Sequence, residues 1–163
     1  MEFSHIKGER SRAVDISHKE DSVRVAVAEG VIYLRNETIE AIKGDKIAKG
    51  NVLAVANTAA IMAVKKTPEL IPMCHPIPLT SIEVEFDFEE FHGGREGIRA
   101  TCTVKSVGKT GVEMEALTGA STALLTVWDM VKSIEKDDTG NYPETAISDV
   151  RVVKKKKQEM KKD

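Results

Sequence analysis

The sequence predicts an α+β fold, in which helices pack on one face of an antiparallel sheet. Residues 82–89 and 98–107 alternate apolar with polar side chains on either side of the glycine pair at 93–94, which is the pattern of a β-hairpin. Residues 51–66 and 116–135 instead carry apolar side chains every three or four positions, as helices do. Strands that pair as a hairpin, with helices gathered on one side, define the α+β class.

The remaining elements follow in chain order. Valines at 23, 25 and 27 begin a strand that continues to Tyr33, and a short helix opens near Asn36 and closes at Gly44. A proline-rich loop at residues 71–78 leads into the hairpin, and residues 147–153 form a last short strand. This order of elements predicts a sandwich of the ferredoxin-like kind. The long second helix is expected to bury a stripe made of Leu117, Ser121, Leu124, Trp128 and Val131.

Size and composition limit the classes of function. The 163 residues suffice for one domain with a hydrophobic core, which we expect at residues 14–153, between a flexible arm at 1–13 and a lysine-rich tail at 154–163. A net charge of −2 and an aromatic content of 4% argue against nucleic acid or a membrane as partner. Cys74 and Cys102 make no disulfide framework and no segment resembles a signal peptide, so the protein is expected in the cytoplasm.

Chemistry is expected where a glycine-punctuated loop leads into the long helix. This stretch holds two carboxylates, Glu113 and Glu115, and further along it Asp129, which lies three positions from Lys132 and so on the same helix face. Each group also has a plainer interpretation. The two glutamates are the kind of first-turn acids that complement a helix dipole, and Asp129 with Lys132 has the spacing of an ordinary surface pair.

The starting point of the helix decides how these acids are placed. If the helix begins near Ala116, the two glutamates point to one side, and if it begins near Val112 they point to nearly opposite sides. In the helical case Glu115 lies about 21 Å along the axis from Asp129. Either the glutamates and Asp129 have separate roles at different ends of the molecule, or a two-fold dimer brings the glutamates of one chain beside Asp129 and Lys132 of its partner. We favour the dimer.

The proline-rich loop carries Cys74 and His75. A thiolate and an imidazole are usual zinc ligands, but neither a C-x-x-C motif nor a second histidine nearby completes four ligands, so no metal is expected. Adjacent residues of an extended loop point apart, which makes Cys74 and His75 a poor nucleophile and base. The loop is either a stiff core loop with a satisfied histidine or a rigid support that holds His75 against a ligand. Lys49 is likewise either a solvated lysine or a further cation of the site.

Three separated segments give the sequence a resemblance to a known family. Residues 70–76, 109–118 and 128–132 closely resemble those of the cyclic pyranopterin monophosphate synthase family, also called the molybdenum cofactor biosynthesis protein C family. The likeness extends from about residue 14 to residue 153. Three motifs in the same order are far more specific than any one of them.

The resemblance implies an enzyme of an early step of molybdenum cofactor synthesis, a phosphorus–oxygen lyase that needs no redox cofactor. It implies a ferredoxin-like subunit, a homohexamer built as a trimer of dimers, and a site at the dimer interface. The implied substrate is the small molecule (8S)-3′,8-cyclo-7,8-dihydroguanosine 5′-triphosphate, and the products are cyclic pyranopterin monophosphate and diphosphate. The implied substrate-binding positions are Met73, Cys74, His75, Glu113 and Met114. The implied catalytic positions are Asp129, Lys132, Lys49, His75, Glu113 and Glu115.

One departure from the family concerns the C-terminal segment. The family usually has Lys-Ser-Gly-Gly after the last strand, whereas residues 154–157 are all lysine here. Lys155 aligns with the functional lysine, but any of the four can substitute, so none is counted among the candidates. The run is either a solvated tail or a contact for an anionic ligand. Two other functions stay open: a metal-dependent nucleotide hydrolase that uses Cys74 and His75, and a non-catalytic nucleotide-binding or scaffold subunit.

Overall fold

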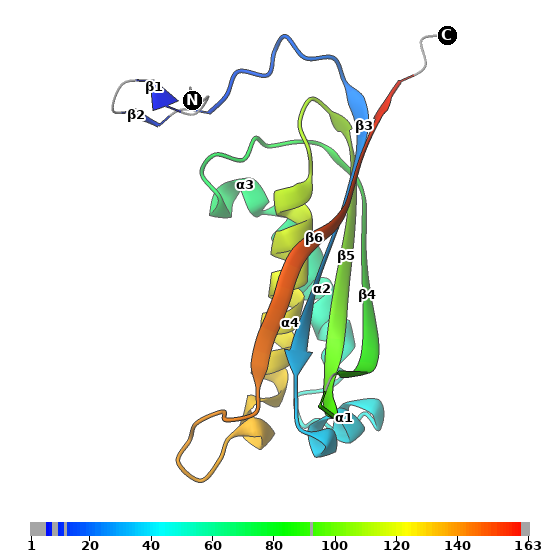
Figure 1. Cartoon of the computed structure of the whole chain (residues 1–163), viewed down its shortest axis with the longest axis vertical. Helices are drawn as coiled ribbons and strands as arrows, with labels where there is room; N and C mark the ends of the chain where they lie inside the picture. The colour runs from blue at the N-terminus through cyan, green and yellow to red at the C-terminus, as the bar shows by residue number, and fades with distance from the viewer. Residues whose placement is uncertain (1–5, 8–9, 12, 92, 161–163) are drawn as a thin grey trace.

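The main sheet consists of four antiparallel strands: β3 (Ser22–Tyr33), β4 (Leu79–Phe91), β5 (Arg95–Gly108) and β6 (Ala146–Glu159). Their order across the sheet is β4-β5-β3-β6 (Figure 1). The computed structural model describes residues 6–7, 10–11, 13–91 and 93–160. Most of the arm predicted at residues 1–13 therefore lies outside the described residues, apart from the short antiparallel pair of β1 (Ile6–Lys7) and β2 (Arg10–Ser11).

The helices of the described part are α1 (Asn36–Lys43), α2 (Val52–Lys65), α3 (Thr67–Leu70) and α4 (Glu113–Glu135). Asn51 caps α2, because its side-chain Oδ1 accepts a hydrogen bond of 2.8 Å from the N–H of Ala54. Pro68 follows the end of α2 and lies in the first turn of α3. A proline is tolerated there because the N–H groups of a first turn have no partner within the helix. Helices α2 and α4 pack against each other on one side of the sheet (Figure 1).

The core lies between these two helices and the sheet, and small residues dominate it. Fully buried residues of the central strands include Ala28 and Cys102, and Gly119 of α4 lies so close to Cys102 that no side chain would fit there. The buried stripe of α4 is therefore made of small residues in its first half, from Ala116 to Ala123, and of larger apolar residues beyond it, and it is rotated from the predicted one. Of the predicted stripe, Leu124 and Val131 are buried, whereas Leu117, Ser121 and Trp128 are only half-buried.

The opposite side of the sheet, which we call the open face, is covered by none of the helices that the structure describes. Successive side chains of a strand point to opposite sides. The buried residues of β3 and β5 are mostly even-numbered, apart from Val31 and Gly97, and the one buried residue of β4 is Val84, so the odd-numbered residues of the paired region form the open face. The register of β6 adds its own residues to this face. The open face comprises Val23, Val25, Val27, Glu29, Glu83, Glu85, Asp87, Glu89, Arg99, Thr101, Thr103, Lys105, Arg151, Lys154 and Lys156.

The predicted α+β class is confirmed, with the helices α2 and α4 on one face of an antiparallel sheet. Strand β6 continues past the predicted end at Val153 to Glu159, so residues 154–157 are part of the sheet. This extension brings alternate lysines of the run to opposite sides of the sheet. Within the described ranges, no helix is both long enough and apolar enough to cross a membrane.

Candidate active site

Helix α4 begins at Glu113, so its two glutamates point in different directions. Glu115 is buried, with 3% of its surface exposed. Glu113 instead forms an ion pair with Lys155 of β6. Lys155 reaches Glu113 because β6 continues beside β3 at this end of the sheet, where Lys155 pairs with Ala26. The extended last strand therefore supplies a cation to the start of the long helix.

The loop between α3 and β4 brings His75 to the same end of α4. Its first residues form a turn in which the N–H of Cys74 donates to the carbonyl of Ile71 at 3.0 Å. The Nε2 atom of His75 lies 2.7 Å from the carbonyl oxygen of Val14. A carbonyl only accepts, so Nε2 carries the hydrogen of this bond and Nδ1 is the ring nitrogen left for a ligand. His75 is thus held by the chain segment that precedes β3.

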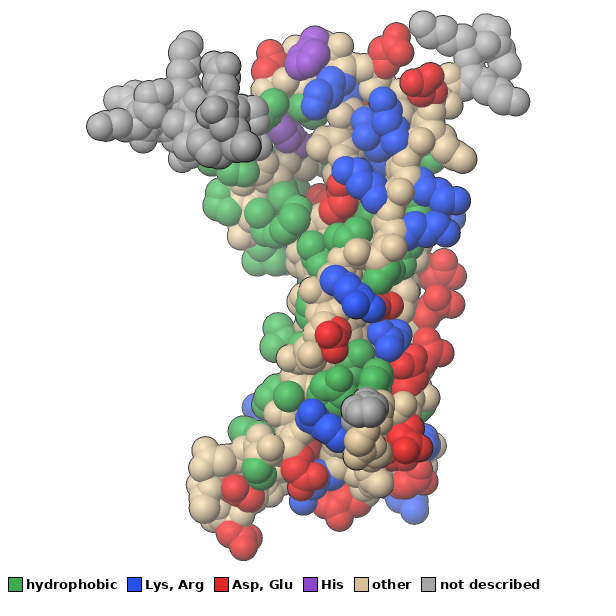
Figure 2. All heavy atoms as spheres, in the orientation of Figure 1, with side chains coloured by type: hydrophobic (Ala, Val, Ile, Leu, Met, Phe, Trp, Pro, Cys, Tyr) green, Lys and Arg blue, Asp and Glu red, His purple; other side chains and the backbone are tan. Residues whose placement is uncertain are grey.

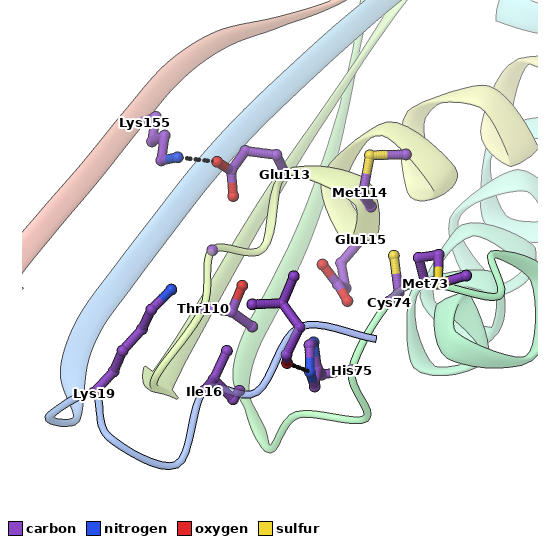
Figure 3. Close-up of a pocket in the computed structure, with 12 residues that line it drawn as sticks. Ile16, Lys19, Met73, Cys74, His75, Thr110, Glu113, Met114, Glu115 and Lys155 are labelled. Atoms are coloured by element: carbon purple, nitrogen blue, oxygen red, sulfur yellow. Dashed lines mark hydrogen bonds and ion pairs between the residues drawn. The ribbon is translucent and has the colours of Figure 1, made fainter. Parts of the chain in front are cut away.

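These elements enclose a cavity of about 440 Å³, within the range of small-molecule sites. Glu115 points from α4 toward the loop that carries Cys74 and His75, and Glu113 points toward Lys155 on another wall (Figure 3). The predicted residues that line the cavity are Met73, Cys74, His75, Glu113, Met114 and Glu115. The cavity is also lined by Val14, Ile16, Lys19, Thr110, Gly111 and Lys155.

Two side chains that line the cavity, Glu115 and Cys74, have raised pKa values. Burial raises the pKa of Glu115 above its usual value of 4.5, and the nearby charge of Glu113 raises it further. Burial and the charge of Glu115 raise the pKa of the Cys74 thiol above 9.0. Cys74 therefore stays a thiol near neutral pH and is a weak nucleophile. Glu115, in contrast, is biased toward the protonated form that a general acid requires.

Gly111 makes room for the Glu113 carboxylate. A Cβ atom at Gly111 would overlap both carboxylate oxygens of Glu113, so only glycine fits while that side chain keeps its place. Gly111 therefore allows the Glu113 side chain to lie over the backbone, where its carboxylate pairs with Lys155.

A second group of charged residues surrounds Asp129, near the other end of α4. The Nζ atom of Lys132 lies 2.7 Å from Oδ1 of Asp129, and that of Lys49 lies 2.9 Å from Oδ2. Lys49 also donates to the main-chain carbonyl of Asp129 at 2.5 Å. Hydrogen bonds from Lys132 and Lys49 lower the pKa of Asp129 to about 2, and Asp129 in turn raises the pKa of Lys132. We call these three residues the Asp129 triad.

Lys49 joins this triad because of the turn that precedes α2. Gly50 has a φ of 99°, a backbone conformation that favours glycine, and Asn51 then caps the helix. The lysine is thereby placed at the start of α2, which packs along α4. Its side chain is 43% exposed, and that of Asp129 is 58% exposed, so the triad is open to a ligand.

The structure gathers the predicted residues into two groups rather than one. Glu113, Glu115 and His75 surround the cavity, whereas Asp129 belongs to the triad. Because α4 is continuous from Glu113 to Glu135, Glu115 and Asp129 are separated by about 21 Å along its axis. Within one chain, a small substrate at the cavity cannot also contact the triad.

Sequence reasoning missed several lining residues. The sequence alone does not single out Lys155 among the four lysines, because the predicted strand ends at Val153. In a strand that continues to Glu159, alternation places the odd-numbered lysines on the helix side. Thr110 lies within the motif at residues 109–118 but is not among the predicted site residues, and Lys19 gives no signal in the sequence. Among the described residues, no three His, Cys, Asp or Glu side chains are grouped as a metal site would require.

Comparisons with known proteins show the family to which this chain belongs. The MoaC family matches residues 13–158. A probable cyclic pyranopterin monophosphate synthase of Archaeoglobus fulgidus is 64% identical over 157 residues, which are 96% of this chain and 97% of the relative. A protein of Methanococcoides burtonii with the same name is 60% identical, over 97% of this chain and 96% of its own. One of Methanothermobacter thermautotrophicus, 57% identical over 98% of this chain and 97% of its own, is named a probable synthase accessory protein. The expected resemblance is confirmed, and the chain belongs to the MoaC family.

Proposed function

We propose that this chain converts (8S)-3′,8-cyclo-7,8-dihydroguanosine 5′-triphosphate to cyclic pyranopterin monophosphate and diphosphate, by acid–base catalysis at a dimer interface in the cytoplasm. The observation that carries the proposal is a carboxylate, Asp129, held between two lysines at one end of α4, with the buried Glu115 at the other end. The names of the relatives from Archaeoglobus fulgidus and Methanococcoides burtonii support it.

The cavity residues suit the guanine-derived ring of this substrate. Opening and rebuilding the ring needs several proton transfers, and a positioned acid or base accelerates each by roughly 10²–10⁴. Glu115, with its raised pKa, is suited to donate a proton to a ring nitrogen or oxygen. Nδ1 of His75 is free to bond the ring, because Nε2 is engaged by Val14. Met73, Cys74 and Met114 supply apolar wall around it.

The lysines suit the phosphate chemistry. To close the cyclic phosphate, a hydroxyl oxygen of the sugar-derived part attacks the α-phosphorus, the bond from that phosphorus to the next phosphate breaks, and diphosphate leaves. The proton of the hydroxyl passes to a base. In the Asp129 triad, Asp129 and Lys132 act as a coupled acid–base pair, and Lys49 is a second proton donor or holds a phosphate.

A two-fold dimer through α4 unites the two groups of residues. Residue 122 lies midway between Glu115 and Asp129, so two antiparallel copies of α4 that cross at Thr122 bring Glu115 of each chain level with Asp129 of the other. The outward stripe of α4 fits such a contact. It contains Leu125, which is 60% exposed, and Met114, which is 39% exposed, with half-buried threonines between them. This dimer is the basic unit of the proposed hexamer.

Mixing two inactive variants tests the shared site. Glu115→Gln and Asp129→Asn are each expected to abolish activity. When the two proteins are unfolded together and refolded, half of the dimers contain one chain of each kind, and each such dimer has one intact site. Roughly one quarter of the wild-type activity should return. If each chain held a complete site, mixing would restore nothing, and the dimer proposal would fail.

A direct assay separates this function from its alternatives. The purified protein is given the cyclic triphosphate, and diphosphate release and pyranopterin product are both measured. A metal-dependent hydrolase would lose its activity to a chelator, and a scaffold subunit would form no product. The synthase is expected to keep activity with chelator present and to lose it in Asp129→Asn and Lys132→Ala, while both variants stay folded by circular dichroism.

A further inference from the structure

The loop between α4 and β6, residues 136–145, has hydrogen bonds of its own that fix its shape. Oδ1 of Asp137 accepts hydrogen bonds from the N–H groups of Thr139 and Asn141, at 2.9 Å each, and from the hydroxyl of Thr139 at 2.7 Å. The N–H of Asp137 donates to the carbonyl of Asn141 at 2.9 Å. Between them Gly140 turns the chain with a φ of 84°. The middle of the loop is therefore held from within.

A buried carboxylate fixes the base of the same loop. Glu135, the last residue of α4, is 2% exposed, and its two carboxylate oxygens accept hydrogen bonds from the hydroxyls of Thr38 and Thr145. The N–H of Arg35 donates to the same carboxylate at 3.3 Å. Because Thr145 is the last residue of the loop, its bond to Glu135 joins the two ends. The loop projects beyond the end of α4 (Figure 1), and Figure 2 shows it as a lobe at the lower left.

Tyr142 attaches this loop to the helix that carries the Asp129 triad. Its ring centroid lies 5.6 Å from that of Trp128, with 70° between the ring planes, which is an edge-to-face contact. Trp128 directly precedes Asp129 and lies four positions before Lys132, so the side chains of Trp128 and Lys132 are neighbours on one face of α4. The loop thus places Tyr142 beside the triad, on the face that carries Lys132.

The phenol of Tyr142 is available to a ligand. The residue is half-buried, and its hydroxyl makes no hydrogen bond to any residue that the structure describes. The hydrogen bond with Asp129 is the main cause of the raised pKa of Lys132, and the proximity of the Tyr142 phenol adds to it. A phenol hydroxyl is a hydrogen-bond donor. The structure therefore places a donor without a partner in the chain within electrostatic range of the Lys132 ammonium.

The charges around this position favour an anion. Lys49 and Lys132 together outweigh the single carboxylate of Asp129. The side chain of Lys132 is 48% exposed, and an ammonium group has three N–H donors, so it can bind a ligand while it pairs with Asp129. The carboxylate of Asp137 is engaged within the loop, and that of Glu135 is buried and hydrogen-bonded. Phosphate oxygens are the acceptors that such a group of donors suits.

We infer that Tyr142 is a further substrate-binding residue of the site, and that its hydroxyl donates a hydrogen bond to an oxygen of the departing diphosphate. The inference rests on the proposed function for the identity of the substrate. Lys49 and Lys132 supply positive charge, and the contact with Trp128 positions the phenol. Tyr142 keeps its proton throughout. Its hydrogen bond stabilises the negative charge that develops on the diphosphate as the bond to the α-phosphorus breaks.

The plainer alternative is that Tyr142 only anchors the loop, and Tyr142→Phe separates the two roles. Phenylalanine keeps the ring against Trp128 and lacks only the hydroxyl. Inorganic diphosphate, titrated by calorimetry, is the probe. Tyr142→Phe is expected to bind it about tenfold more weakly than wild type, as the loss of one hydrogen bond to a charged group predicts, with an unchanged midpoint of thermal unfolding. Lys132→Ala should also weaken binding, because the probe would lie at the triad.

The reaction provides a second measurement. With the cyclic triphosphate as substrate, kcat/KM of Tyr142→Phe should fall by about the same factor of ten, because the hydroxyl acts on the group that leaves. The matched control is Tyr33→Phe. Tyr33 is the other tyrosine of the chain and also makes an edge-to-face contact, with 5.2 Å between its ring centroid and that of Phe91. It lies on β3, and its variant should bind diphosphate as wild type does.

Four results would each overturn the inference. They are a wild-type protein that binds no diphosphate, a Tyr142→Phe variant that binds it as tightly as wild type, a Lys132→Ala variant that does so, and an equal loss in Tyr33→Phe. Failure of the proposed function would be seen separately. In that case the protein would form no pyranopterin product from the cyclic triphosphate, yet it would bind diphosphate and bind it more weakly in Tyr142→Phe.

Discussion

Lys49 reaches the carboxylate of Asp129 across 80 positions of sequence, with 2.9 Å between its Nζ and the Oδ2 of Asp129. Lys132 contacts the other carboxylate oxygen from the same helix. All three side chains are largely exposed, so water weakens these ion pairs and they add little to stability. Their effect is to keep Asp129 ionised and to hold it in one orientation.

The first prediction concerns the titration of Asp129. We expect its carboxyl carbon, followed by NMR, to titrate near pH 2, because Lys132 and Lys49 both favour the ionised form. The lowered pKa means that any stability from this group is present above 3.8 and is lost as the pH falls through about 2. In Lys132→Met the midpoint should rise toward 3.8. An unchanged midpoint in that variant would show that the lysine does not act on Asp129.

The second prediction concerns Glu115. Its pKa is raised in the folded state, so the native protein binds more protons than the unfolded chain, and stability should fall as the pH rises from 4.5 through the folded-state pKa. Glu115→Gln removes this decline. The variant should therefore gain stability relative to wild type between pH 4 and pH 7, measured by urea unfolding at each pH. A constant difference between the two proteins across this range would contradict a raised pKa.

The third prediction concerns Cys74. Because burial and the charge of Glu115 raise its pKa, iodoacetamide should modify it several-fold more slowly at pH 8 than it modifies an unhindered peptide thiol. Glu115→Gln removes one of the two causes and should speed the reaction. Cys102, whose pKa burial raises to about 12, should stay unmodified, so Cys74→Ser should take up no label. Equal rates in wild type and Glu115→Gln would exclude the influence of Glu115 on the thiol.

The fourth prediction concerns Gly111. Gly111→Ala puts a methyl group where the Glu113 carboxylate lies and should displace that side chain from Lys155, at a cost of about 1–3 kcal/mol in folding stability if it cannot move freely. Activity should fall with it. Gly108→Ala is the matched control, since the nearest atom to its new methyl is 3.6 Å away, an ordinary contact. If both variants behave alike in activity and thermal unfolding, the tight fit at Gly111 has no consequence.

Local patterns were enough to predict most elements from the sequence. Alternation in β4 and β5 and the glycine pair between them predicted the hairpin, and the spacing of apolar residues predicted α2 and α4. The buried stripe of α4 was predicted less well. The prediction holds for Leu124 and Val131 but not for Leu117, Ser121 and Trp128, because the close approach of Gly119 to Cys102 turns the small residues of the first half of α4 toward the sheet.

For the candidate site, the sequence predicts a set of residues but not their arrangement. The motifs identified Glu113, Glu115 and His75, yet nothing local indicated that Val14 would hold His75 or that β6 would extend far enough to supply Lys155. Both contacts join segments that are distant in sequence, and a one-dimensional pattern carries no signal for them. The contact of Lys49 with Asp129 is of the same kind.

In the proposed dimer, the length of α4 between Glu115 and Asp129 sets the distance between the two groups that must meet across the interface. Removing one residue from this part of the helix shortens it by about 1.5 Å and turns one end by about 100° relative to the other. Such a deletion at an outward position near Thr122 would leave every catalytic side chain present and yet misalign both sites of the dimer. In the proposed dimer, the number of residues in this helix would therefore determine activity as much as the identity of the acids at its ends.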